Sequence, residues 1–272
     1  MLLNAGTAAT GATCLAEESL LSVRLRHRQG SLRLDVEFRL TAPWTVLFGP
    51  SGSGKSTALR AIAGFVRPDE GRIASGDPEQ LLVSTAERCF VPAHLRPVRS
   101  AGQTARLFPG MRVREGVAYG LGRGAKGATP HRDGREVVEE VMGLFRLSAL
   151  AERMPGDLSG GERQRVSVAR AVVSAVTFEG PRRALLLLDE PFSGLDAALR
   201  DELAFSLRDW LDRWKTPVLS VSHDVGEAFL LGAEVIRMVE GRVVEQGPVE
   251  VVLAGERERL LAGLHRSSLR RA

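Results

Sequence analysis

The stretch Gly49-Pro50-Ser51-Gly52-Ser53-Gly54-Lys55-Ser56-Thr57 matches the pattern G-x-x-x-x-G-K-[ST]. An apolar run precedes it at residues 44–48 and a helical pattern follows at 58–64, which is the strand, loop and helix order that the pattern requires. Glycines let successive backbone N–H groups turn inward, and these amides and the helix N-terminus bind phosphate oxygens. The stretch therefore predicts a nucleotide-binding loop; a Gly/Ser turn that happens to precede a helix is the simpler alternative.

Lysine is rare in this chain, which has 37 basic residues but lysine only at Lys55, Lys126 and Lys215. A lysine ammonium is a compact point charge that suits a phosphate cradle, where the arginine fork does not fit. We expect Lys55 to contact the β- and γ-phosphates and the Ser56 hydroxyl to bind Mg²⁺. The rarity of lysine argues against a chance match of the motif.

The composition is that of a globular chain of 272 residues, with 44% hydrophobic residues, 26% charged residues and a net charge of +4. It indicates one compact domain or two closely joined ones and excludes disordered, collagen-like and disulfide-scaffold chains. No stretch approaches the roughly 18 consecutive apolar residues of a membrane-spanning helix. Residues 1–20 lack a secretory signal, and Cys14 and Cys89 lack metal-ligand spacing. We therefore expect reduced thiols in a cytoplasmic chain.

Strand and helix signals alternate along the chain. Residues 21–25 and 32–40 alternate apolar with polar side chains, as half-buried antiparallel strands do. Residues 44–48, 184–188 and 217–221 are short apolar runs typical of buried strands. A Gly-rich loop at 121–134 leads into a helix with one apolar face, made of Val137, Val138, Val141, Met142 and Phe145. The pattern predicts a mixed sheet flanked by helices.

An acidic pair follows the apolar run at 184–188. Asp189 is placed to hold Mg²⁺, directly or through water, and Glu190 to orient and polarise an attacking water. Acidic residues also end strands merely as solvated turn starters, so the pair by itself leaves both interpretations open.

The segment Leu158-Ser159-Gly160-Gly161-Glu162-Arg163-Gln164-Arg165, called the signature segment below, precedes that acidic strand and opens a helix. Here the sequence resembles the ATP-binding-cassette (ABC) family. Gln103 matches the family's Q-loop, Ser193-Gly194-Leu195-Asp196 its D-loop, and His223 its switch histidine, and the likeness extends over about residues 21–252. Ser159 with Glu162 three residues on also reads as a helix capping box, and both interpretations can hold.

The resemblance implies an α/β fold: a P-loop NTPase ABC cassette with a RecA-like mixed-sheet core, an N-terminal antiparallel β subdomain and a small helical subdomain. We expect the ATPase domain at 21–253, with the helical subdomain at about 104–170. Residues 1–20 are expected to be a disordered extension or the product of a misplaced start, and 254–272 a basic tail. A C-terminal regulatory domain is not expected.

The resemblance also implies that two copies stack head to tail around ATP and Mg²⁺. Ser159, Gly160 and Gly161 of one chain would close over the γ-phosphate bound by Lys55 of the other. Glu190 would be the general base, with His223 contacting the γ-phosphate and holding Glu190 and water. Gln103 would sense Mg²⁺ and water. The expected catalytic residues are Glu190, His223 and Gln103. The expected metal-binding residues are Ser56, Gln103 and Asp189. The expected nucleotide-binding residues are Gly49, Pro50, Ser51, Gly52, Ser53, Gly54, Lys55, Ser56, Thr57, Ser159, Gly160 and Gly161.

Implied partners are a second copy, an integral membrane permease touched by the helical region and, indirectly, a solute-binding protein. The chain would then sit on the cytoplasmic face of the membrane. Residues 103–120 look like importer ATPases, most closely those of molybdate uptake, with another solute such as sulfate, polyamine or iron as the alternative. Three other classes compete: a soluble ABC ATPase of DNA repair or translation, a different P-loop enzyme such as a small-molecule kinase, and a non-catalytic ATP-binding scaffold.

Several features depart from the family pattern. No aromatic residue stands at 26–30 to stack on adenine, so His27 or an arginine must serve or the stacking is weak. Residues 97–102 form a poor candidate for a buried strand, and 177–183 suggest an inserted surface loop. An excess of arginine at 96–126 could indicate nucleic acid, but a surface facing a membrane subunit and anionic lipid explains it more directly, and no nucleic-acid partner is expected.

Overall fold

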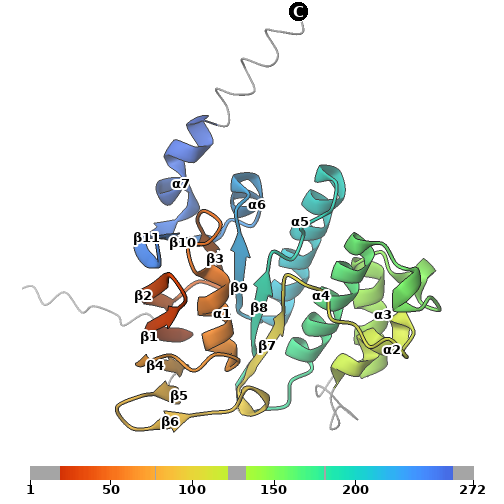
Figure 1. The fold of residues 1–272 in the computed structure, drawn as a ribbon. Helices are drawn as coiled ribbons and strands as arrows, with labels where there is room; N and C mark the ends of the chain where they lie inside the picture. The colour runs from red at the N-terminus through yellow and green to blue at the C-terminus, as the bar shows by residue number, and fades with distance from the viewer. Residues whose placement is uncertain (1–18, 77, 122–132, 181, 260–272) are drawn as a thin grey trace, which may run out of the picture.

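The computed structural model describes residues 19–76, 78–121, 133–180 and 182–259. Within these ranges the strands form one eleven-stranded sheet, in the order β6-β5-β4-β1-β2-β11-β10-β3-β9-β8-β7. Figure 1 shows an antiparallel β region at one end of this sheet, a core in the middle and a helical region at the other end. The expected α/β cassette with its three parts is confirmed. The expectations for residues 1–18, most of the Gly-rich loop and the end of the tail lie outside the described residues.

The antiparallel region grows from the alternation of apolar and polar side chains. β1 and β2 pair over their whole lengths, from Leu21 opposite Leu40 to Gln29 opposite Leu32. Their apolar side chains are buried, and the opposite face carries arginines and carboxylates that pair across strands, such as Arg26 with Asp35. The strands are β1 (Leu21–Gln29), β2 (Leu32–Leu40), β4 (Glu70–Ser75), β5 (Gln80–Ser84) and β6 (Cys89–Phe90).

Three strands of the core, at residues 44–48, 185–189 and 218–222, are short and apolar, as strands buried on both faces must be. β3, β9, β8 and β7 are parallel neighbours, and β10 runs parallel to β3 on its other side. Their carboxyl ends therefore meet at one edge of the sheet. The strands are β3 (Trp44–Phe48), β7 (Val98–Ala101), β8 (Leu185–Asp189), β9 (Val218–Ser222), β10 (Glu234–Val239) and β11 (Arg242–Pro248).

The expectation that residues 97–102 make a poor buried strand is wrong. Residues 98–101 form β7, in register with β8 from Val98 opposite Leu185 to Ala101 opposite Leu188. β7 is the edge strand, so only two of its side chains need to be buried, and Val98 and Ala101 are. The Arg99 guanidinium lies 4.5 Å from the Phe178 ring centroid, which gives the polar strand an aromatic cover.

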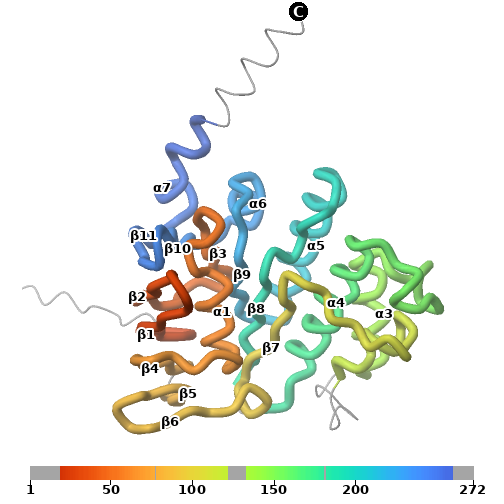
Figure 2. Tube along the Cα trace, in the orientation of Figure 1, coloured from red at the N-terminus to blue at the C-terminus, as the bar shows by residue number. Residues whose placement is uncertain are grey.

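Helices cover both faces of the core. One apolar cluster joins α1 to the β region and one face of the core strands, and the other joins α3, α4 and α5 to the opposite face. In Figure 2 the chain passes from β6 through β7, beside α1, into the helical region. The helices are α1 (Lys55–Ala63), α2 (Val113–Ala118), α3 (Gly134–Leu144), α4 (Gly160–Val176), α5 (Ala197–Trp214), α6 (Val225–Leu230) and α7 (Val249–Val252). Short 3-10 turns are η1 (Ala93–Leu95), η2 (Tyr119–Leu121), η3 (Ser148–Leu150) and η4 (Pro155–Asp157).

The expected surface loop at 177–183 is tied to the protein by arginines in its described part. Arg182 donates to the Ser75 carbonyl at 2.7 Å and to the Pro78 carbonyl, and Arg183 donates to the Trp214 carbonyl. Phe178 packs against the apolar cluster of the helical side. The loop therefore bridges the β region and the end of α5.

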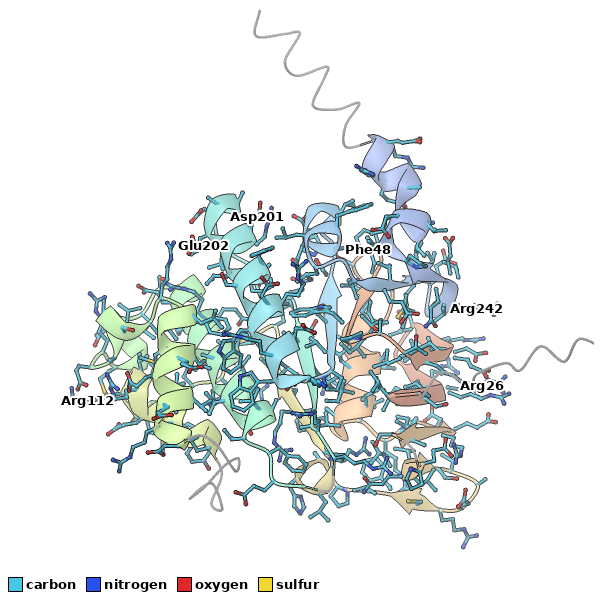
Figure 3. All side chains as sticks on the ribbon, turned by 180° about the vertical axis from the view of Figure 1, so that it is seen from behind. Arg26, Phe48, Arg112, Asp201, Glu202 and Arg242 are labelled. Carbon is cyan, nitrogen blue, oxygen red and sulfur yellow. The ribbon has the colours of Figure 1, made fainter. Side chains whose placement is uncertain are left out.

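In the described part of the chain, every helix is too short or too polar to cross a membrane. Figure 3 shows the two ends of the molecule: Arg112 in the helical region lies far from Arg26 and Arg242 in the β region.

Candidate nucleotide site

The loop from Gly49 to Gly54 joins β3 to α1 and has little room for side chains. A Cβ on Gly49 would lie 2.1 Å from the Met238 carbonyl oxygen, and a Cβ on Gly54 would lie 2.8 Å from Leu34 Cδ1. Gly54 also has φ 96°, a left-handed conformation that favours glycine. The loop is held from outside by a hydrogen bond from Gly241 N–H to the Ser53 carbonyl at 3.2 Å. Glycine is therefore required at position 49 by the close backbone of Met238 and at position 54 by the left-handed conformation.

Lys55 begins α1 and is buried, with 6% of its surface exposed. Its Nζ donates to the carbonyls of Gly49 at 2.7 Å and Pro50 at 2.8 Å. Burial lowers the pKa of Lys55, while the charges of Glu190 and Asp189 oppose the shift. A desolvated ammonium held at the base of a glycine loop is suited to bind an anion that enters the loop.

Ser56 in the first turn of α1 contacts Asp189 at the end of β8. Its Oγ donates to Asp189 Oδ1 at 3.1 Å. Burial raises the pKa of Asp189, and the hydrogen bond from Ser56 opposes the shift. A hydroxyl and a carboxylate oxygen are the hard donors that Mg²⁺ takes alongside water and phosphate oxygens. Among the residues described, no group of three or more His, Cys, Asp or Glu side chains could hold a metal alone. The pair therefore fits a Mg²⁺ ion shared with a nucleotide.

Glu190 follows β8 and is the meeting point of the other predicted residues. Gln103 Nε2 donates to Glu190 Oε2 at 3.2 Å, and His223 Nδ1 lies 3.3 Å from Glu190 Oε1. The Glu190 side chain is 20% exposed and that of His223 is 65% exposed. Gln103, predicted also as a metal-binding residue, contacts the carboxylate of Glu190 in this structure. Both oxygens of the predicted base are thus contacted by the predicted Q-loop glutamine and the predicted switch histidine.

The signature segment forms a separate surface. Ser159 caps α4: its Oγ accepts from Glu162 N–H at 3.2 Å, and Glu162 Oε2 accepts from Ser159 N–H at 2.7 Å. The predicted capping box is therefore present. A Cβ on Gly161 would lie 3.1 Å from Leu195 Cδ2, so the signature segment packs on the D-loop. The two segments and Gln103 line a cleft of about 800 Å³, and none of its lining residues comes from 49–57.

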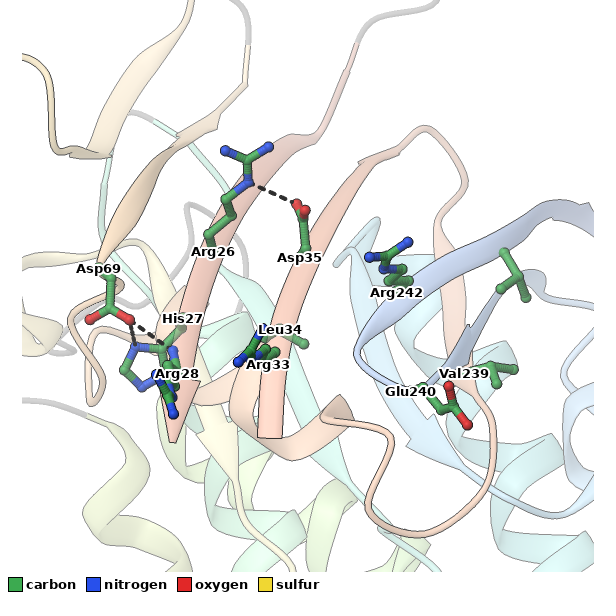
Figure 4. A pocket seen from close by; sticks show the side chains of 11 residues that line it. Arg26, His27, Arg28, Arg33, Leu34, Asp35, Asp69, Val239, Glu240 and Arg242 are labelled. Atoms are coloured by element: carbon green, nitrogen blue, oxygen red, sulfur yellow. Dashed lines mark hydrogen bonds and ion pairs between the residues drawn. The ribbon is translucent and has the colours of Figure 1, made fainter. Parts of the chain in front are cut away.

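A second cleft, of about 960 Å³, lies between the β1–β2 and β10–β11 hairpins (Figure 4). No Phe, Tyr or Trp lines it; its lining side chains are Arg26, His27, Arg28, Arg33, Leu34, Asp35, Asp69, Val239, Glu240, Arg242 and Val244. His27 is an inward-facing residue of β1, 14% exposed, with Nδ1 3.5 Å from Asp69 Oδ2. The alternatives that the sequence leaves for holding adenine, which are His27, an arginine or weak stacking, stay predictions.

Sequence reasoning missed a polar network beneath His223, made of Ser222, Asp224, Glu227 and Arg200. Glu227 and Ser222 are buried, and their side chains are hydrogen-bonded at 3.1 Å. Asp224 Oδ2 lies 2.6 Å from Arg200 Nη1 on α5. The spacing Asp224-x-x-Glu227 has the form of a helix start and could have drawn attention to this turn.

The family model and the similar proteins agree on one family. The family described as ABC transporter matches residues 35–193. The chain is 37% identical over 235 residues to the molybdenum import ATP-binding protein ModC of Mesorhizobium japonicum, covering 86% of this chain and 60% of that protein. It is 37% identical over 236 residues to the molybdate/tungstate import ATP-binding protein WtpC of Archaeoglobus fulgidus, covering 87% and 90%. The chain thus spans about 60% of the length of the first ModC relatives it matches.

Solved structures share the fold at low sequence identity. The dimeric, ADP- and Pi-bound post-hydrolysis state of the ATP-binding cassette MJ0796 aligns with a TM-score of 0.67 at 23% identity, covering 84% of this chain and 98% of that one. CbiO1 from Clostridium perfringens, part of the ABC transporter complex cbiONQ, aligns with a TM-score of 0.69 at 23% identity, covering 94% and 100%.

Proposed function

The chain belongs to the ABC transporter family, and on this premise we propose that it binds ATP with Mg²⁺ and hydrolyses it to drive solute import through a separate permease. The convergence of six side chains at the carboxyl edge of β3, β9, β8 and β7 supports ATP hydrolysis most directly. These side chains are Lys55, Ser56, Gln103, Asp189, Glu190 and His223.

In the proposed reaction the glycine loop and Lys55 bind the phosphates, because the ammonium exchanges the Gly49 and Pro50 carbonyls for phosphate oxygens. Ser56 and Asp189 would hold Mg²⁺, which neutralises charge on the β- and γ-phosphates when bound. Glu190 accepts the proton of the attacking water. His223 and Gln103 fix its carboxylate from two sides, so that the base stays aimed at the phosphate end of the site.

A second copy completes the site in this proposal. The signature segment and the loop 49–57 line different surfaces of one chain, so one chain alone does not close over a nucleotide. The dimeric state described for the MJ0796 cassette is consistent with a two-copy assembly. We propose that Ser159, Gly160 and Gly161 of one copy close over the nucleotide bound by Lys55 of the other.

The permease would dock on the helical region. Phe108 and Tyr119 are exposed there, and their rings pack in a tilted arrangement with centroids 4.6 Å apart. An exposed aromatic pair is a typical anchor for a partner helix. The chain would then lie on the cytoplasmic face of the membrane, and a solute-binding protein would deliver solute to the permease from the other side.

Molybdate is the proposed solute, because the first relatives matched are named for molybdenum or molybdate/tungstate import. Uptake of molybdate, tungstate and sulfate in a strain lacking this gene tests it. Loss of molybdate uptake alone or with tungstate supports the proposal, whereas loss restricted to sulfate or to another solute overturns it.

ATP turnover by the purified chain tests the enzymatic part. Glu190→Gln should lower kcat at least about 100-fold, because the amide cannot accept the proton of the attacking water. Binding of ATP should remain, since Glu190 does not hold the phosphates. Turnover that survives this substitution would show that Glu190 is not the base.

A further inference from the structure

Glu227 is a buried carboxylate behind the proposed active site. Among the described residues it is the one acidic residue in the buried class, with 5% of its surface exposed. It lies in the first turn of α6, and its Oε2 accepts a hydrogen bond from Ser222 Oγ at 3.1 Å. Its Oε1 is buried without a hydrogen-bond partner. An unpartnered buried carboxylate oxygen is costly and calls for a reason beyond stability.

The hydrogen bonds around Glu227 enclose the turn that carries His223. Ser222 Oγ, which donates to Glu227, accepts from Asp224 N–H at 3.1 Å. Asp224 Oδ1 accepts from Glu227 N–H at 2.9 Å. Both chain neighbours of His223 are therefore fixed by one closed ring of hydrogen bonds that includes Glu227.

His223 depends on this ring for its position. Its own side chain is 65% exposed, and within the described residues its polar contact is Nδ1 to Glu190 Oε1 at 3.3 Å. A side chain with so little packing is oriented mainly by its backbone. Arg200 on α5 steadies the same turn through its 2.6 Å ion pair with Asp224.

Stability does not explain a glutamate at this place. Burial raises the pKa of Glu227 to about 7, and the nearby charges of Asp224 and Glu190 add to the shift while Ser222 and Arg200 oppose it. An apolar side chain of similar size would avoid the cost of burying this carboxyl group. What such a residue would lose is the acceptor for Ser222.

We propose that Glu227 is a positioning residue for ATP hydrolysis: through Ser222 it fixes the 222–224 turn so that His223 stays in reach of Glu190. The inference rests on the proposed ATPase function. Glu227 touches neither substrate nor reacting atoms in this scheme, so its effect appears in the chemical step and not in ATP binding.

The test compares Glu227→Ala, Glu227→Gln and Ser222→Ala in ATP turnover by the purified full chain. Glu227→Ala and Ser222→Ala should each lower kcat about tenfold with KM for ATP within about twofold, because misplacement of a catalytic group slows the chemical step. Glu227→Gln keeps an acceptor for Ser222 and should restore kcat to within about threefold of wild type. The double Ala variant should be no slower than either single one.

Glu256→Ala is the matched control, because Glu256 is a mostly buried glutamate paired with Arg237 and is remote in sequence from the turn. Its kcat should equal that of wild type. Thermal unfolding of each variant separates a loss of fold from a loss of positioning. The inference is overturned if Glu227→Ala has the kcat of Glu256→Ala, or if Glu227→Gln is as slow as Glu227→Ala. It is also overturned if the kcat losses of Glu227→Ala and Ser222→Ala multiply in the double variant. Failure of the proposed function looks different: wild type itself would not hydrolyse ATP, or Glu190→Gln would still do so.

Discussion

Glu190 adopts a left-handed backbone conformation, with φ 50°. Its N–H donates to the Val221 carbonyl at 3.1 Å, and its side chain is held by Gln103 and His223. A non-glycine residue in this region costs of order 1 kcal/mol and persists where the surroundings fix it, which is frequent at functional sites. The strained backbone at Glu190 comes directly after β8, where the carboxylate contacts Gln103 and His223.

Two parts of the candidate site could be predicted from the sequence, because each is a short, local motif. The glycine loop with Lys55, and the acidic pair after a buried run, need only their immediate neighbours to be recognised. Their meeting with Gln103 and His223 depended on the family resemblance, since no local pattern brings distant strand ends together. Glu227 could not be predicted as a buried residue, because its burial depends on the packing of α6 beside β9.

The pKa of Glu227 predicts a pH-dependent stability. It rises from an ordinary value of 4.5 to about 7, so between these values the folded chain keeps a proton that the unfolded chain has released. The free energy of unfolding should therefore fall as pH rises through this window, by up to about 3 kcal/mol from this group. Glu227→Gln should lack this contribution.

Denaturant unfolding of wild type and Glu227→Gln, measured from about pH 4.5 to about pH 7.5, tests this expectation. The difference between the two curves isolates Glu227 from the other titrating groups. Curves that stay parallel across the window would contradict the raised pKa.

At the scale of elements, α1 connects the glycine loop, residues 49–54, to a buried arginine. Arg96 is fully buried, and its Nη1 donates to the carbonyls of Ala61 at 2.8 Å and Ile62 at 2.7 Å, in the last turn of α1. Its Nε donates to the Val91 carbonyl at 2.8 Å. Burial lowers the pKa of Arg96 to about 10, so it stays charged at neutral pH. The Arg96 cation at the C-terminal end of α1 complements the helix dipole, whose positive end lies at the glycine loop.

Arg96→Met should destabilise the protein by about 3 kcal/mol, because buried carbonyls of two segments lose their donor while the volume is nearly kept. Arg96→Lys should recover less than half of the loss, since one ammonium cannot replace the guanidinium fork. Arg60→Met removes an exposed arginine of the same helix and should change the free energy of unfolding by less than about 0.5 kcal/mol. Equal stability of the Arg96 and Arg60 variants would contradict this role.

Elements were predictable where one face had to be buried. The apolar runs at 44–48, 184–188 and 217–221 became β3, β8 and β9 with shifts of at most one residue at an end. β7 was missed because an edge strand needs few apolar side chains, and its cover by Phe178 comes from a segment 80 positions away along the sequence. Tertiary context of this kind is absent from a local pattern.

At the scale of the whole molecule, the proposed function divides the ATP site into two half-sites on one chain. The glycine loop follows the carboxyl end of β3. The signature segment and the D-loop line a cleft to which residues 49–57 do not contribute. Gly160 sits open in that cleft, because a Cβ on it would meet nothing within 4 Å. A glycine that its own chain leaves uncrowded is expected where another molecule approaches closely.

Mixing two inactive variants tests the head-to-tail assembly. Lys55→Ala removes the proposed phosphate-binding charge, and Gly160→Asp adds a negative charge to the signature segment at a position where a Cβ meets nothing within 4 Å. Each variant alone should hydrolyse ATP at least about 100-fold more slowly than wild type. In a mixed head-to-tail dimer one site carries both defects and the other carries neither. An equimolar mixture should therefore regain up to about a quarter of wild-type turnover, since half of the dimers are mixed and each has one intact site.

The outcome distinguishes the assembly from a site completed within one chain. If Lys55 and Gly160 of the same chain served the same nucleotide, every site in the mixture would keep one defect, and turnover would equal the average of the two variants. Lys215→Ala removes another of the three lysines, an exposed one at the end of α5, and is the control for loss of charge. An equimolar mixture of Lys215→Ala with Gly160→Asp should show about half of wild-type turnover, because a quarter of the dimers then have two intact sites and half have one. Recovery that rises with protein concentration would identify dimerisation as the step that completes the site, because only association brings the two half-sites together.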